Sequence, residues 1–139
     1  MDCPVQIGGR DYRITCLSVG NPHCVVFCDR VDSVDIKTVG PQFENAPMFP
    51  QRINTEFIRV VNKNMIKMRV YERGNGETLA CGTGACAAVA AAVKNGFCVR
   101  GEDVVVKLRG GDLTVNYGKG GNVTLTGDAK LVFEGVMKY

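Results

Sequence analysis

The stretch Gly82–Lys94, with the sequence GTGACAAVAAAVK, constrains the fold of this chain more than any other segment. Alanine is the strongest helix former, and Asn95-Gly96 directly after the run is typical of a helix end. A helix that is apolar on every side is stable only when the rest of the protein surrounds it. We therefore expect a helix over residues 82–94 that lies inside the domain.

The remainder of the chain reads mainly as short strands separated by turns rich in Gly and Asn. A chain of 139 residues fits one domain with a sizeable core. We expect an α+β fold in which about eight mostly antiparallel strands curl as a barrel around the central helix, with a short second helix near residues 36–45. The expected strands are Tyr12–Val19, His23–Cys28, Asn54–Val61, Met65–Glu72, Asp103–Arg109, Asp112–Tyr117, Asn122–Gly127 and Ala129–Val136.

Charge and hydropathy exclude several classes of protein. The formal charge is +3, from 17 basic and 14 acidic residues, and no run of Lys or Arg points to nucleic acid. No apolar run reaches the roughly 18 to 20 residues that a membrane span needs. The first residues also lack the pattern of a secretory signal. We therefore expect a soluble, cytoplasmic protein that binds neither nucleic acid nor membrane.

The seven cysteines favour free thiols over disulfides or a metal site. An odd number leaves at least one thiol unpaired, and most of the cysteines lie inside apolar runs, where buried free cysteine is common. Cys24 and Cys28 fall in one expected strand, about 13 Å apart, which is too far for one metal ion. With a single histidine in the chain, we expect no metal.

Cys81 stands apart from the other cysteines because it directly precedes the alanine-rich helix in the sequence ACGTGA. Unpaired N–H groups at a helix N-terminus favour anions and lower the pKa of a nearby thiol. We therefore expect Cys81 to be poised as a thiolate, and Gly82, Thr83 and Gly84 to let a bound carboxylate approach the backbone. The alternative is a buried cysteine next to a helix that begins with glycine for steric reasons.

The same turn also matches a dinucleotide-binding pattern. Gly82–Ala87 fits G-x-G-x-x-A, and Glu102 and Asp103 follow about twenty residues later. No buried strand leads directly into Gly82, however, and the sequence after the helix reads as hairpins rather than as a β-α-β unit. Nucleotide binding stays open as the weaker alternative.

Five further polar residues lie at the ends of expected strands: Asn21, His23, Asn54, Glu72 and Arg73. Each has an ordinary explanation by itself, as a turn residue or as part of a surface ion pair. Together with Cys81 they suggest a polar ligand pocket around the start of the helix.

At this point four segments reveal a family resemblance: GNPHCVVF, PQFENAPMFPQR, NTEFIRV and RVYERGNGETLACGTGACAA. In this order along the chain, they resemble the C-terminal half of diaminopimelate epimerase. The resemblance implies a cofactor-independent enzyme that interconverts L,L- and meso-diaminopimelate on the route to lysine and peptidoglycan. It also implies two similar domains, each with strands wrapped around a central helix, and one catalytic cysteine from each domain.

The resemblance assigns roles to individual residues. It implies that Cys81 is one of the two catalytic acid/base groups, and that His23 and Glu72 tune the pKa values of the cysteines. The substrate would be held by Asn21, Asn54, Glu72, Arg73, Gly82 and Thr83.

One feature of the family is missing from this sequence. The Cys-Gly-Asn-Gly run that carries the family's first cysteine is absent, since Gly74-Asn75-Gly76 follows an arginine. We therefore expect residues 1–139 to be the C-terminal domain alone, inactive without a partner N-terminal domain. A homodimer of the chain stays open as a further partnership. A binding module that holds a carboxylate or an amino acid without chemistry is the alternative.

Overall fold

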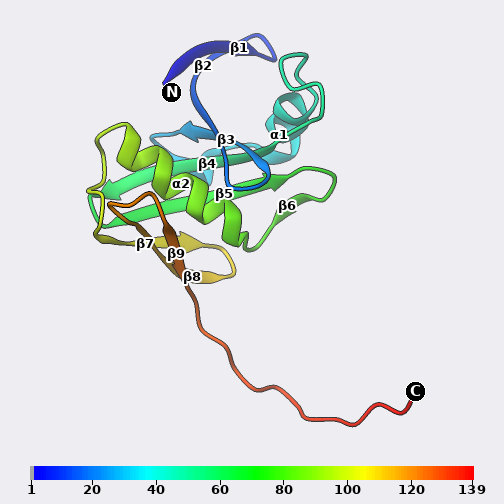
Figure 1. Cartoon of the computed structure of the whole chain (residues 1–139). Helices are drawn as coiled ribbons and strands as arrows, with labels where there is room; N and C mark the ends of the chain where they lie inside the picture. The colour runs from blue at the N-terminus through cyan, green and yellow to red at the C-terminus, as the bar shows by residue number, and fades with distance from the viewer. Residues whose placement is uncertain (1) are drawn as a thin grey trace.

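A computed structural model describes residues 2–139 and shows one mixed sheet with two α-helices. This confirms the expected α+β class, with the elements arranged as in Figure 1. The strands are β1 (Cys3–Ile7), β2 (Arg10–Ser18), β3 (Pro22–Phe27), β4 (Asn54–Asn62), β5 (Met65–Glu72), β6 (Gly76–Thr78), β7 (Asp103–Leu108), β8 (Gly111–Tyr117) and β9 (Val123–Thr126). The helices are α1 (Ile36–Glu44) and α2 (Gly82–Lys94), with a 3₁₀ turn, η1, at Val31–Ser33.

The strand order is β1-β2-β3-β4-β5-β7-β8-β9, and the short β6 pairs with β5 as a side branch. The pairs β3–β4 and β5–β7 are parallel, and the other pairs are antiparallel, as expected for most of the sheet. β4 and β5 form a hairpin around Lys63-Asn64.

The sheet is not closed as a barrel, which corrects our expectation. In the part of the chain that the structure describes, β1 and β9 are the two ends of the path and do not pair with each other. Closure requires the two edge strands to meet with matched tilt and register. Here the sheet stays open, and α2 lies across one of its faces (Figure 1).

The two faces of the sheet carry separate hydrophobic cores. On one face, the alanines of α2 pack against inward side chains such as Val25, Ile58 and Met68. On the other face, Phe43 of α1 packs with Phe57 and Val26. Alternate residues of each strand supply the two cores because successive side chains of a strand point to opposite faces. The expected burial of α2 is confirmed, and Cys86 lies in the hydrophobic core on the α2 face of the sheet.

The last part of the chain differs from our expectation of a strand over residues 129–136. Residues 127–139 leave the sheet as an extended tail with no secondary structure (Figure 1). A strand requires hydrogen bonds from a neighbouring strand, and the tail runs away from the sheet. Strands β1 and β6 were also missing from our expectation.

No helix within residues 2–139 combines the length and the apolar character needed to cross a membrane. The same described part of the chain contains no group of three or more His, Cys, Asp or Glu side chains that could hold a metal ion.

Candidate functional site at the N-terminal end of α2

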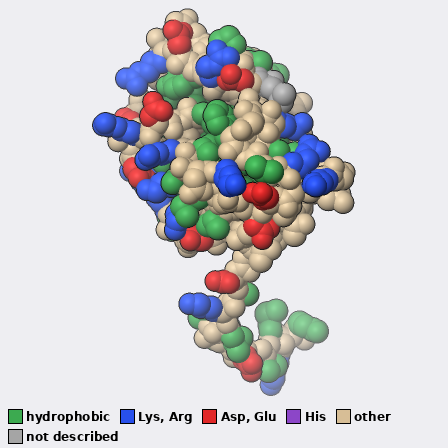
Figure 2. All heavy atoms as spheres, turned by 90° about the vertical axis from the view of Figure 1, so that its left-hand side faces the viewer, with side chains coloured by type: hydrophobic (Ala, Val, Ile, Leu, Met, Phe, Trp, Pro, Cys, Tyr) green, Lys and Arg blue, Asp and Glu red, His purple; other side chains and the backbone are tan. Residues whose placement is uncertain are grey.

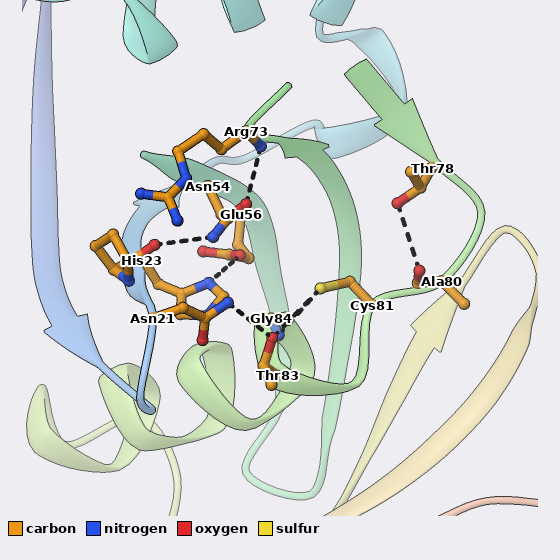
Figure 3. Close-up of polar contacts among 11 residues, drawn as sticks. Asn21, His23, Asn54, Glu56, Arg73, Thr78, Ala80, Cys81, Thr83 and Gly84 are labelled. Atoms are coloured by element: carbon orange, nitrogen blue, oxygen red, sulfur yellow. Dashed lines mark hydrogen bonds and ion pairs between the residues drawn. The ribbon is translucent and has the colours of Figure 1, made fainter. Parts of the chain in front are cut away.

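The topology brings the polar strand ends to one place. β3 and β4 are parallel, so both strands begin at the same end of the sheet, with His23 opposite Asn54. β5 runs antiparallel to β4, so its last residue, Glu72, lies at that same end of the sheet. Helix α2 begins there as well, and Figure 3 shows its first residues facing the polar side chains of the strands. The structure therefore brings these strand ends together beside the start of α2.

A buried acid–base pair lies at the centre of this site. His23 Nδ1 lies 2.6 Å from Glu56 Oε1, and neither side chain is exposed to solvent. Burial raises the pKa of Glu56, while the hydrogen bond with His23 acts in the opposite direction. The second oxygen of the carboxyl, Oε2, has no hydrogen-bond partner among the described residues. A buried polar atom without a partner costs stability, so it calls for an explanation.

The orientation of Asn21 fixes the proton on the other nitrogen of His23. Asn21 Oδ1 lies 3.0 Å from His23 Nε2, and Asn21 Nδ2 donates to Thr83 Oγ1 at 3.4 Å. An amide oxygen only accepts, so Nε2 is the donor in this contact, and Nδ1 faces Glu56 Oε1. The result is a hydrogen-bonded relay from Glu56 through His23 and Asn21 to Thr83 on the first turn of α2 (Figure 3).

Asn54 and Arg73 join two loops beside this relay. The backbone N–H of Arg73 donates to Asn54 Oδ1 at 2.8 Å, and Asn54 Nδ2 donates to the carbonyl of Pro22 at 3.0 Å. The guanidinium of Arg73 makes one hydrogen bond, from Nη1 to the carbonyl of Gln51 at 3.2 Å. Its remaining donors meet no acceptor within residues 2–139, so they are available to a ligand.

Cys81 is the N-cap residue of α2. Its Sγ accepts a hydrogen bond from the N–H of Gly84 at 3.3 Å and lies 3.7 Å from Thr83 Oγ1. Gly84 permits this approach, because a Cβ there would lie 2.9 Å from Glu56 Oε1 and 3.1 Å from the sulfur. The thiol, the buried carboxyl and the helix backbone are thus packed against one another.

The protonation of Cys81 differs from our expectation. Partial burial raises the pKa of the thiol and outweighs the lowering by Gly84 and Thr83, and the charges of Glu72 and Glu56 raise it further. We expected a thiolate because the helix N-terminus favours negative charge. The two carboxyls and the loss of hydration oppose that effect, so the resting group is the thiol.

The first turn of α2 offers free donors to an anion. The first intrahelical bond runs from Ala85 N to Cys81 O. The preceding amides of Gly82 and Thr83 donate to no other group in the described part of the chain. Such amides, with the positive end of the helix dipole, form a binding place for a carboxylate.

Glu72 lies near these groups without a hydrogen bond to them. Its charge raises the pKa values of both Cys81 and Glu56. Glu56 itself was not among our candidate residues. The signal was present, because an acidic residue two positions after Asn54 falls on the same strand face as the apolar Ile58. A charged residue on a buried face indicates a partner, and here the partner is His23.

The structure corrects one argument that we made against nucleotide binding. β5 and β7 are parallel neighbours joined through α2, so a β-α-β connection does exist. The turn after β5 and the strand β6 nevertheless stand between β5 and Gly82, and no buried strand leads directly into the glycine turn.

Comparison with known proteins agrees with this arrangement. The family model described as diaminopimelate epimerase matches residues 15–132. Curated diaminopimelate epimerases from Cyanothece sp. and from Pelotomaculum thermopropionicum are 53% and 52% identical, over 96% and 98% of this chain. In both cases the match covers 48% of the relative, so the chain spans about half the length of the curated relatives it matches.

Solved structures share the fold at low sequence identity. A predicted epimerase from Pseudomonas aeruginosa matches with a TM-score of 0.53 and 19% identity, over 91% of this chain and 47% of the other. A PhzF-family phenazine biosynthesis protein from Bacillus anthracis matches with a TM-score of 0.56 and 18% identity, over 82% and 38% of the two chains. The family model and the curated relatives together show that the chain belongs to the diaminopimelate epimerase family.

Proposed function

We propose that this chain is the C-terminal half of a diaminopimelate epimerase and supplies one of two cysteine acid/base groups. One observation carries the proposal: the Cys81 thiol caps α2 beside unpaired backbone donors and two carboxyls. The membership of the family supports the substrate class. The chain's share of its relatives' length supports the view that a second half completes the enzyme.

The proposed reaction inverts a carbon atom without a cofactor. A base on one face removes the α-proton while an acid on the other face delivers a proton. The raised pKa of Cys81 suits the acid, because a thiol holds the proton to be delivered. In the reverse direction Cys81 becomes the base, and the hydrogen bonds from Gly84 and Thr83 stabilise its thiolate.

The substrate α-carboxylate would bind at the amides of Gly82 and Thr83. There the helix N-terminus lies close to the negative charge that develops when the α-proton leaves. At the distal end of the substrate, the free donors of Arg73 suit a bidentate contact with the second carboxylate. Asn21, Asn54 and Glu72 would complete the contacts with that amino-acid head.

The proposed missing half would bring the second cysteine to the open side of the site, and His23 would tune the pKa of that thiol. Through its contact with Glu56, the ring of His23 is held in one orientation. The tail supports a partner domain too, because six of its large apolar side chains are exposed. Figure 2 shows apolar side chains along the tail below the body of the molecule. Apolar side chains gathered in this way mark interaction surfaces. They are Leu131, Val132, Phe133, Val136, Met137 and Tyr139.

The decisive experiment measures α-proton exchange. The isolated chain is incubated with L,L-diaminopimelate in D₂O, and we expect deuterium incorporation no faster than in buffer. A chimera that joins the N-terminal half of the Cyanothece sp. relative to this chain is expected to exchange and to form the meso isomer. Cys81→Ser in the chimera is expected to abolish both reactions, since one of the two proton-transfer groups is lost.

Two controls separate catalysis from folding and from binding alone. Cys98→Ser changes a buried cysteine away from the site, and the chimera carrying it should keep its activity if it folds. Calorimetry on the Cys81→Ser chimera should still detect the substrate. A folded chimera that binds diaminopimelate without any exchange would favour the binding module instead, and exchange by the isolated chain would contradict the half-enzyme proposal.

A further inference from the structure

We propose that Cys16 and Cys24 are a cross-strand thiol pair that peroxide converts, reversibly, into a disulfide between β2 and β3. Neither residue belongs to the site at α2. The inference does not depend on the proposed function.

The register of the sheet places the two residues directly opposite each other. β2 and β3 are antiparallel, and Cys16 is the partner of Cys24. Both side chains lie on the face that carries the α1 core, since Ile14 and Val26, two positions away on each strand, belong to that core. The two thiols therefore share one face of the sheet at the shortest cross-strand distance.

The kind of pairing also suits a disulfide. Ser18 is opposite Pro22, which has no N–H, so these two residues cannot exchange both hydrogen bonds. The bond from Val19 N to Asn21 O, at 3.1 Å, lies just beyond them and marks them as a non-hydrogen-bonded pair. Pair types alternate along an antiparallel ladder, so Cys16 and Cys24 are also a non-hydrogen-bonded pair. Cα atoms in such pairs lie about 4.5 Å apart, within the range that a disulfide bridges.

The two thiols differ in a way that gives each one a role. Cys16 is exposed, and its side-chain interaction with Cys24 lowers its pKa. Cys24 is wholly buried, and the same interaction together with burial raises its pKa. An exposed thiol that ionises readily is the one an oxidant attacks. A neighbouring thiol then resolves the product.

The steps balance with hydrogen peroxide as the oxidant. The Cys16 thiolate attacks one peroxide oxygen, the O–O bond breaks, and the released hydroxide takes a proton to become water. The Cys24 thiol then attacks the Cys16 sulfenic acid at sulfur, and the S–O bond breaks as the S–S bond forms. The Cys24 proton leaves with the hydroxide as a second water molecule. Two thiols are oxidised and one peroxide is reduced.

The other cysteines are less well placed to take part. Cys28 lies four residues beyond Cys24 on the same side of the chain, about 13 Å away along an extended strand. Cys81, Cys86 and Cys98 contact the core on the α2 face of the sheet. Cys3 on β1 is opposite Ile14, so its relation to Cys16 is diagonal rather than direct. Cys3–Cys16 is therefore the competing linkage to exclude.

Peptide mapping of the oxidised chain tests the proposal. The chain is exposed to a small excess of hydrogen peroxide, unfolded in N-ethylmaleimide to block free thiols, and digested with chymotrypsin. Cleavage after Leu17 and Phe27 places Cys16, Cys24 and Cys28 in three different peptides. We expect one linked product, Cys16 with Cys24, which is lost on treatment with dithiothreitol.

Two variants make the result decisive. Cys16→Ser, at an exposed position, should abolish the linked product. The intact mass of this variant after peroxide treatment should then not fall by the two hydrogen atoms that a disulfide removes. Cys28→Ser is the matched control and should form the product as the unchanged chain does. A linkage of Cys3 to Cys16, a linkage that survives Cys16→Ser, or oxidation of Cys16 to the sulfinic acid without any linkage would each overturn the proposal.

Discussion

Two acid–base pairs lie on opposite faces of the same sheet, one wholly buried and one partly buried, and they differ in how completely their hydrogen bonds are satisfied. On the α1 face, Arg69 donates to both oxygens of Glu77, at 2.8 and 3.2 Å, and its third nitrogen reaches the carbonyl of Val34 at 2.8 Å. The pair ties β6 and η1 to β5. The hydrogen bond from Arg69 lowers the pKa of Glu77.

On the α2 face, the pair of His23 and Glu56 is left incomplete. One carboxyl oxygen of Glu56 has no partner in the described part of the chain, and burial raises the pKa of the group. The saturated pair has the character of a structural brace. The unsaturated pair leaves one carboxyl oxygen without a partner at the place where the proposed chemistry occurs. Sites of this kind commonly reduce stability in exchange for function.

The largest expected effect comes from breaking the saturated pair. Arg69→Met keeps a side chain of similar length but removes the guanidinium, which leaves Glu77 and the carbonyl of Val34 without their main donor. Removing one partner of a buried ion pair typically costs about 3–5 kcal/mol, and less where the other partner is partly exposed, as Glu77 is. Urea denaturation of the isolated chain should show a loss in the free energy of unfolding of that order.

Arg109→Met is the matched control for that measurement. Arg109 also lies 3.2 Å from Glu77, but its side chain is 49% exposed. Exposed pairs contribute about 0–1 kcal/mol. If both variants lost the same free energy of unfolding, the stabilisation by the Arg69–Glu77 pair would not depend on the burial of Arg69. The comparison between the two faces would then fail.

A smaller effect is expected from filling the space between Cys81 and Glu56. Gly84→Ala introduces a Cβ 2.9 Å from Glu56 Oε1 and 3.1 Å from the sulfur. Overpacking of this kind costs about 1–3 kcal/mol, and the thermal midpoint of unfolding should fall. Gly82→Ala is the control, because its Cβ would meet only the flexible end of Leu125, at 3.0 Å. An equal loss in both variants would indicate a general cost at the start of α2 rather than a tight site.

The smallest expected effect is a difference in how the contributions of Glu77 and Glu56 to stability depend on pH. The pKa of Glu77 is lowered, so its contribution to stability is present above its ordinary value of 4.5 and is lost as the pH falls through the folded value. The pKa of Glu56 is raised, so its contribution is present below 4.5 and is lost as the pH rises through the folded value.

Stability measured by urea denaturation across this pH range separates the two groups. Relative to the unchanged chain, Glu77→Gln should be most destabilising above its unfolded pKa and least destabilising in acid. Glu56→Gln should remove a decline in stability that the unchanged chain shows as the pH rises above 4.5. Slopes of the same sign for both variants would contradict the contrast between the pairs.

The sequence predicted the elements whose patterns are local. The bounds of α2 match our expectation because alanine favours helix along the whole run and Gly96, with φ of 81°, ends it. The strand ends that carry Asn21, His23, Asn54 and Glu72 were also expected, and the parallel register of β3 with β4 explains why they meet. That register joins segments far apart in the sequence, so no local pattern contains it.

The features that the sequence did not predict depend on contacts between segments that are far apart in the chain. The raised pKa of Cys81 results from burial and from two carboxyls brought in by β4 and β5. The tail has the composition of a strand, but a strand exists only where another strand accepts its hydrogen bonds. The open sheet likewise follows from the positions of β1 and β9, which only the assembled topology gives.

Because the sheet is open, its two outer strands, β1 and β9, each have one side without a neighbouring strand in residues 2–139, and these two sides are not equally protected against self-association. β1 contains Pro4, which has no N–H and interrupts any strand that tries to pair along it. β9 has the sequence VTLT, with no proline and no charge, and its Leu125 is exposed. An extended segment of another molecule can add there by ordinary strand pairing. We therefore expect self-association of the isolated chain to begin at β9, and a lysine at Thr124 or Thr126 is the substitution that would guard this edge.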